Sequence, residues 1–107
     1  MNSIHWTVPM VVAVVSVLFL FLAYQPRHTV LYFAPWCGHC KTLMPVWDEL
    51  QKELGSLMQK IDCTQDGNNC GIQAFPTIIL YSGWQSKKYE GPRTKEALRD
   101  FIVNYQL

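Results

Sequence analysis

The sequence Phe-Ala-Pro-Trp-Cys-Gly-His-Cys-Lys, from Phe33 to Lys41, places two cysteines, Cys37 and Cys40, two residues apart. An apolar run with a β-branched residue and aromatic residues precedes them, and a helical pattern follows them. A thiol at the start of a helix meets unpaired backbone N–H groups and the positive end of the helix dipole, which favour the thiolate. We therefore expect Cys37 to be a solvent-accessible nucleophile and Cys40 to resolve the mixed disulfide that it forms.

The segment from Trp36 to Lys41 resembles the active site of the catalytic domains of protein disulfide isomerases, within the thioredoxin superfamily. Thioredoxins themselves usually carry proline where His39 stands. The resemblance extends from Thr29 to Leu107. It implies an α/β domain with a truncated thioredoxin-like fold, in which about four strands are flanked by helices. It also implies a thiol–disulfide oxidoreductase or isomerase that acts on protein disulfides, without a metal or an organic cofactor.

The resemblance assigns catalytic roles to two residues besides Cys37 and Cys40. His39 would donate a hydrogen bond to the Cys37 thiolate and stabilise the reduced form. That effect predicts an isomerase-type potential near roughly −180 mV, rather than the value of about −270 mV found in thioredoxin. Arg93 matches an arginine that isomerase domains move toward the active site, where it lowers the pKa of the second cysteine.

Three further residues are expected to hold the substrate. A proline directly before a strand, as in Phe75-Pro76-Thr77, suggests a turn or a cis peptide bond. In the family this proline is cis and packs against the active-site disulfide, and the backbone of the preceding residue pairs with the extended substrate. The resemblance transfers these roles to Phe75 and Pro76. Trp36 is expected to shape the surface beside Cys37.

Cys63 and Cys70 form a second pair. Similar cysteines at the same spacing form a structural disulfide in some isomerase domains, and the resemblance implies the same bond here. A zinc site built from all four cysteines is the alternative, although the spacing of the second pair lies outside the usual zinc-knuckle range.

The chain departs from the family pattern at Leu31, which stands six residues before Cys37. The family has a buried glutamate there, which relays protons to the resolving cysteine and pairs with a lysine that matches Lys60. We therefore expect Lys60 to lack its usual partner and proton transfer at Cys40 to be slow.

The N-terminal segment differs in composition from the rest of the chain. The protein has 107 residues and a formal net charge of +1, which leaves room for one domain and gives no electrostatic case for binding nucleic acid. No charged side chain precedes Arg27, and the stretch from Val8 to Tyr24 is almost entirely apolar, with Trp6 and Tyr24 near its ends. This pattern predicts a single-pass membrane anchor over residues 1–26, with a cleaved signal peptide as the alternative.

The four cysteines and the active-site motif favour an oxidising location for the domain at 27–107, such as the lumen of the endoplasmic reticulum or its equivalent. A short linker around Gln25 would keep that domain close to the membrane. Within the domain, periodicity and turn signals predict strands at 29–33, 57–61, 77–81 and 87–90, helices at 37–54 and from Thr94 onward, and one or two helical turns at 66–72.

Thioredoxin domains usually open with a strand and a helix, and from the resemblance we expect the apolar segment to take the place of both. A domain this small is marginally stable, and one sheet edge near Leu57 to Ile61 should be uncovered. We expect a partner chain, a second copy or the end of the anchor helix to cover it.

The sequence allows two alternatives to the oxidoreductase or isomerase function. One is a membrane-tethered reductase for one dedicated client. The other is a non-catalytic structural component of the membrane that uses the thioredoxin scaffold as a binding module.

Overall fold

The computed structural model describes residues 4–23, 26–65, 67 and 69–107. Three α-helices and four strands account for most of the described chain, with a short 3₁₀ turn, η1, at Gly55–Leu57. The helices are α1 (Ile4–Ala23), α2 (Gly38–Leu54) and α3 (Lys95–Asn104). The strands are β1 (Arg27–Phe33), β2 (Met58–Asp62), β3 (Thr77–Ser82) and β4 (Gln85–Lys88).

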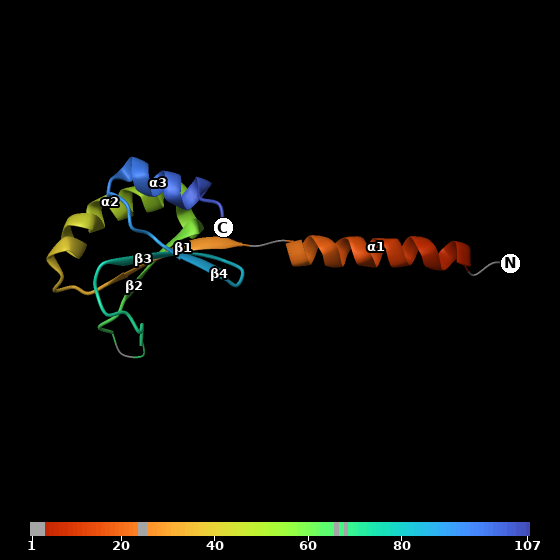
Figure 1. Ribbon diagram of the computed structural model, residues 1–107, viewed down its shortest axis with the longest axis horizontal. Coiled ribbons are helices and arrows are strands. Elements are labelled where there is room, and N and C mark those ends of the chain that lie inside the picture. The colour runs from red at the N-terminus through yellow and green to blue at the C-terminus, as the bar shows by residue number, and fades with distance from the viewer. Residues whose placement is uncertain (1–3, 24–25, 66, 68) are drawn as a thin grey trace.

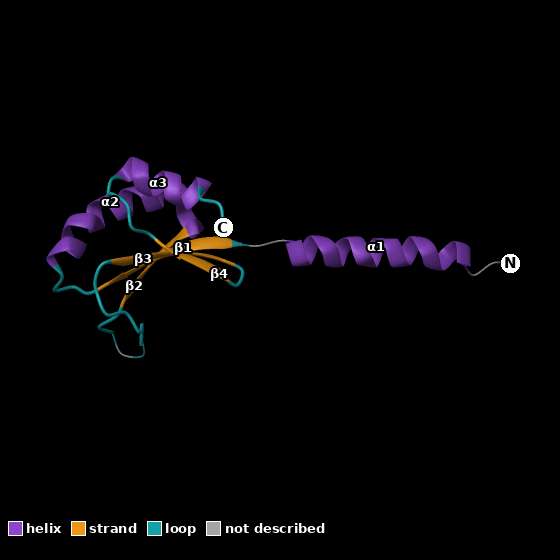
Figure 2. Ribbon diagram, in the orientation of Figure 1, coloured by secondary structure: helices purple, strands orange, loops and turns teal. Residues whose placement is uncertain are grey.

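The strands form one mixed sheet in the order β2-β1-β3-β4. β1 pairs in parallel with β2, with Leu31 opposite Lys60, and antiparallel with β3, with Leu31 opposite Ile78. β3 and β4 form an antiparallel hairpin. α2 and α3 both lie on one face of this sheet, so the domain has two layers (Figures 1 and 2). The sequence from Phe33 to Lys41 runs from the last residue of β1 into the first turn of α2.

The core lies between the sheet and the two helices. The apolar side chains of α2 recur every three or four residues and pack toward the sheet, which is the pattern of an amphipathic helix. Trp47 and Leu50 of α2 are fully buried, as is Leu98 of α3. Thr94 begins α3 as predicted, because its side chain accepts a hydrogen bond from the Ala97 N–H.

α1 projects away from the domain (Figure 1), and the chain extends 74 Å along its longest axis. The large apolar side chains described along α1 are all exposed, from 53 % at Val8 to 74 % at Phe21. No helix in the described part of the chain combines the length and the apolar content that a membrane crossing requires. The structure therefore does not support the expected transmembrane helix. Tyr24, Gln25 and the side chain of Trp6 lie outside the described residues.

Two predicted segments differ from the structure. The predicted helical turns at 66–72 are wrong for the described residues, of which Gly67 lies in a turn and residues 69–72 have no regular structure. Gly67 and Gly71 adopt positive φ angles, which a right-handed helix does not allow; Asp66 itself lies outside the described residues. The last strand begins at Gln85, earlier than predicted, because Gly83 at φ 60° permits a two-residue turn after Ser82.

The prediction of an open sheet edge is confirmed for the described residues, since β2 is the outermost strand and has one strand neighbour, β1. The face of the sheet opposite α2 and α3 carries no helix in the described part of the chain (Figure 2). Tyr32 and Tyr81 lie on this face, where their hydroxyl oxygens are 2.8 Å apart in a hydrogen bond. α1 extends away from β2, so it does not cover the edge (Figure 1).

A disulfide joins Cys63 and Cys70 after β2, with 5.7 Å between the Cα atoms. The bond closes a short loop. Removing it should therefore raise the entropy of the unfolded chain, and so lower the stability of the domain, by less than removing a bond that closes a loop of about 15 residues. We expect the double variant Cys63→Ser/Cys70→Ser to lose roughly 2 kcal/mol of the free energy of unfolding. Denaturant unfolding of the two proteins under oxidising conditions measures this difference. An unchanged midpoint would show that the bond does not stabilise the domain.

Candidate active site

Cys37 is the residue that caps the N-terminus of α2. Its Sγ accepts a hydrogen bond from the backbone N–H of Cys40 at 3.1 Å, and its carbonyl oxygen accepts from Lys41 N–H at 3.1 Å. Both cysteines are free thiols, so the structure represents the dithiol form. A helix N-terminus carries unpaired N–H groups and partial positive charge, and Sγ of Cys37 lies at this end of α2.

Cys37 is more exposed than Cys40, as predicted, with exposed fractions of 7 % and 1 %. Cys37 is nevertheless more buried than the sequence led us to expect. The reason is local packing: Ala34 is fully buried beside the two cysteines, and Phe33 and Phe75 pack against the same cluster. Only a small part of the Cys37 side chain is therefore open to an approaching disulfide.

The Phe75–Pro76 peptide bond is cis. Phe75 belongs to the apolar cluster around the cysteines and meets Trp36 edge to face, with ring centroids 5.9 Å apart. Trp36 itself is 71 % exposed. The structure thus brings Trp36, Phe75 and Pro76 into one surface beside Cys37, with an exposed aromatic ring at its rim.

The thiol of Cys40 is held in its neutral form. Burial is the main cause that raises the pKa of Cys40, to about 11, and the hydrogen bond with the Cys37 side chain raises it further. The positive charge of Arg93 acts in the opposite direction and lowers this pKa. The predicted link between Arg93 and Cys40 therefore has an electrostatic basis in the structure.

This difference predicts a pH dependence for alkylation of Cys40. In the Cys37→Ser variant, the rate of Cys40 modification by iodoacetamide should rise about tenfold per pH unit between pH 7 and pH 9, because only the thiolate reacts and the variant keeps the burial that is the largest cause of the raised Cys40 pKa. Mass spectrometry of quenched samples gives the rate. A plateau below pH 9 would show that burial does not hold Cys40 neutral.

His39 and Arg93 approach the cysteines from different elements. His39 lies in the first turn of α2, where its side chain is exposed and makes no hydrogen bond with Cys37 among the described residues. Arg93 lies in the loop before α3 and lines a cavity with Pro76. The predicted hydrogen bond from His39 to the Cys37 sulfur is thus absent from the dithiol form described here.

Lys60 lacks its usual acidic partner, because Leu31 stands in that place, but it pairs with another carboxylate that the sequence analysis did not foresee. Its Nζ lies 2.6 Å from Oδ1 of Asp48 on α2, while Leu31 is fully buried in the core. Asp48 also lines a cavity of about 310 Å³ that Cys40 and Met44 border. The sequence carried a signal for this arrangement that we missed, because Cys40, Met44 and Asp48 recur every four residues and so share one face of α2.

Comparison with known proteins gives the class of this fold and site. The thioredoxin family model matches residues 21–104. A probable protein disulfide-isomerase A6 of Medicago sativa is 39 % identical over 80 residues, which cover 66 % of this chain and 22 % of the relative. The protein disulfide-isomerase of Saccharomyces cerevisiae is 42 % identical over 82 residues, which cover 68 % of this chain and 16 % of the relative.

Among solved structures, the J-Trx1 fragment of ERdj5 superimposes with a TM-score of 0.66 and 30 % identity, over 72 % of this chain and 40 % of that one. The chain belongs to the thioredoxin family. Its domain is of the protein disulfide-isomerase type, and it spans less than a quarter of the length of the two curated relatives described above.

Proposed function

We propose that the protein is a thiol–disulfide oxidoreductase or isomerase that acts on protein disulfides through Cys37 and Cys40. The observation that carries this proposal is a pair of free thiols at the N-terminus of α2, with Phe75 of the cis peptide bond packed against them. Relatives named protein disulfide-isomerase support it further.

The chemistry needs only these two sulfurs and the substrate. The Cys37 thiolate attacks one sulfur of a substrate disulfide, forms a mixed disulfide and releases the other substrate sulfur as a thiolate. The Cys40 thiolate, formed after its proton is lost, then attacks the Cys37 sulfur. This step releases the reduced substrate and leaves a Cys37–Cys40 disulfide. The reverse sequence oxidises a substrate dithiol, and attack by a second substrate thiol on the mixed disulfide isomerises the substrate.

The surrounding residues take supporting roles in the proposal. His39, which makes no hydrogen bond to Cys37 in the described dithiol form, is proposed to set the potential from its exposed place between the two cysteines, and Arg93 lowers the pKa of Cys40. The backbone around Phe75 and Pro76 holds the substrate in extended form. Trp36 provides the exposed aromatic edge of the same surface. Cys63 and Cys70 serve stability and take no part in exchange.

A trapping experiment tests this proposal. The Cys40→Ser variant should accumulate mixed disulfides with substrate proteins, because the sulfur that resolves them is gone. Mass spectrometry would identify the captured proteins and map the linkage to Cys37. The matched control is Cys37→Ser/Cys40→Ser, which should capture nothing. Equal capture by both variants would exclude exchange at this site.

A non-catalytic binding role is the second candidate. Leu31 is fully buried where the family carries an acid, and β2 leaves an open sheet edge in the described part of the chain. If the protein serves as a scaffold, Cys37→Ser should leave its biological role intact. A reductase for one client is the third candidate, and a potential near that of thioredoxin would favour it.

We also propose that residues 1–26 attach the domain to a lipid bilayer on its oxidising side. The support is the exposure of apolar side chains along α1 and the disulfide between Cys63 and Cys70. The full chain should stay with membranes during alkaline extraction. The variant Val14→Lys/Leu18→Lys should be released, because charge in an apolar segment is costly in lipid. The control Val14→Leu should be retained; release of all three proteins would exclude attachment through α1.

A further inference from the structure

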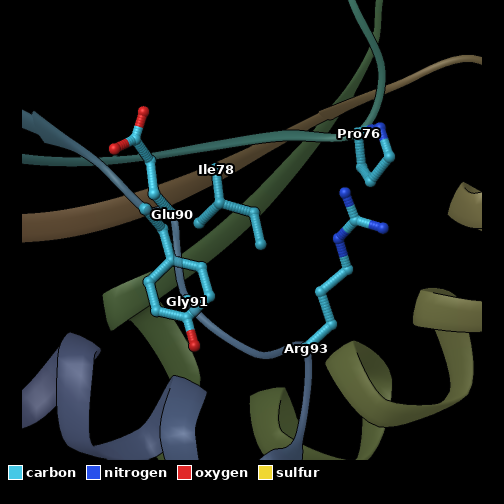
Figure 3. Close-up of a pocket in the computed structure, with 6 residues that line it drawn as sticks. Pro76, Ile78, Glu90, Gly91 and Arg93 are labelled. Carbon is cyan, nitrogen blue, oxygen red and sulfur yellow. The ribbon is translucent and has the colours of Figure 1, made fainter.

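A cavity of about 410 Å³ opens beside Phe75 and Pro76, the residues proposed to hold the substrate. It begins at Pro76, next to Phe75, and extends along Ile78 to the segment that leads into α3. Figure 3 shows the side chain of Arg93 extending toward Pro76, while the Glu90 carboxylate lies on the far side of Ile78. The cavity therefore presents a guanidinium group at the end nearest the two cysteines.

The loop that carries Arg93 is held in place by Tyr89. The Tyr89 backbone N–H donates to the Ile78 carbonyl oxygen at 2.8 Å, and its hydroxyl donates to the Pro92 carbonyl oxygen. Gly91 packs so closely on this ring that a Cβ atom there would lie 2.7 Å from the Tyr89 hydroxyl oxygen. These contacts fix the backbone from which the Arg93 side chain enters the cavity.

Two charged residues, Arg93 and Glu90, line the cavity, and their side chains lie on opposite sides of Ile78 (Figure 3). The carboxylates of α2 are engaged by cations elsewhere, since Asp48 pairs with Lys60 and both Glu49 and Glu53 pair with Lys95. In contrast, neither Arg93 nor Lys41 makes an ion pair within the described ranges. A negatively charged group that enters the cavity would thus meet an uncompensated guanidinium.

We propose that the cavity between Pro76 and Arg93 is a subsite for an acidic side chain of the substrate polypeptide. Substrates with Asp or Glu within a few residues of the reacting cysteine are then preferred over neutral or basic ones. An extended chain advances about 3.3 Å per residue, so a side chain close to that cysteine reaches the cavity mouth beside Phe75. Arg93 recognises the carboxylate by charge-assisted hydrogen bonds. This inference rests on the proposed exchange activity and names its substrate class.

Single-turnover reduction of model peptides tests the subsite. Each peptide holds one internal disulfide and carries Glu, Gln or Lys at one position within three residues of a cysteine. The full-length protein in its dithiol form reduces the peptide, and chromatography of quenched samples gives the second-order rate constant. At the position that reaches the cavity, the Glu peptide should react roughly two- to fivefold faster than the Gln peptide, with the Lys peptide slowest. Added salt should shrink this preference.

Variants separate the subsite from the influence of Arg93 on Cys40. Arg93→Gln should slow all peptides through Cys40, yet bring the Glu-to-Gln rate ratio to about one because the carboxylate loses its partner. Glu90→Gln removes the acidic group that lines the cavity and should raise the ratio. Lys87→Gln is the matched control, since it removes one positive charge that does not line the cavity, and it should leave the ratio unchanged.

Each other outcome is decisive. If the wild-type protein reduces the peptides at equal rates whatever the charge, or if the preference survives Arg93→Gln, the subsite is excluded while the exchange activity stands. If no peptide is reduced although the protein is folded, the proposed function fails and the subsite fails with it.

Discussion

Replacement of Cys37 by serine is expected to lower the rate of disulfide exchange at least about a hundredfold, because a hydroxyl group is a far weaker nucleophile than a thiolate. Cys37 is the sulfur at the N-terminus of α2 and is more exposed than Cys40. Reduction of a peptide disulfide by the full chain, followed in single turnover, measures the effect.

Two comparisons make this expectation specific. Cys63→Ser/Cys70→Ser removes two other cysteines, which form the disulfide after β2, and it should retain most of the exchange rate at a temperature where it is folded. Cys40→Ser should form the mixed disulfide at Cys37 and then stall. If Cys37→Ser kept more than about a tenth of the wild-type rate, Cys37 would not be the attacking group.

Truncation of Trp47 to alanine is expected to cost about 3–5 kcal/mol of the free energy of unfolding, because it empties the largest fully buried site of the core. Small domains are stable by about 5–15 kcal/mol in total, so the variant should be close to unfolding at room temperature. Denaturant unfolding followed by far-ultraviolet circular dichroism measures the loss.

Trp47→Phe is the matched control. The indole N–H of Trp47 is buried and has no hydrogen-bond partner among the described residues, so an aromatic ring without that group should cost much less. If Trp47→Ala and Trp47→Phe lowered the free energy of unfolding equally, the volume of the side chain at this position would not determine the stability of the core.

Local signals were enough to predict most of the fold. Continuous runs of β-branched, aromatic and other apolar residues predicted β1 and β3, and the Thr94 cap together with the spacing of Leu98 and its neighbours predicted α3. The predicted edge near β2 is also present, since β2 is the outermost strand of the described sheet. The strands and α3 depend on neighbours in the sequence, which a single sequence displays.

Other features depended on contacts between distant segments. The pair between Lys60 and Asp48 joins β2 to α2, and the burial of Cys37 depends on Phe75, which lies far along the chain. Tyr89, which holds the loop that carries Arg93, is itself placed by a hydrogen bond to Ile78 of β3 and so depends on the hairpin of β3 and β4. No local pattern encodes such contacts, so the sequence alone could propose candidate site residues but not how their side chains are held.

The redox equilibrium of Cys37 and Cys40 tests the central claim most directly. The full chain would be equilibrated in buffers with different ratios of reduced to oxidised glutathione, and the two forms would be counted by mass spectrometry after alkylation. We expect the dithiol and the Cys37–Cys40 disulfide to interconvert reversibly with a potential near roughly −180 mV. A value of about −270 mV would favour a reductase. If the two sulfurs form no disulfide at any ratio, the protein does not carry out exchange at this site.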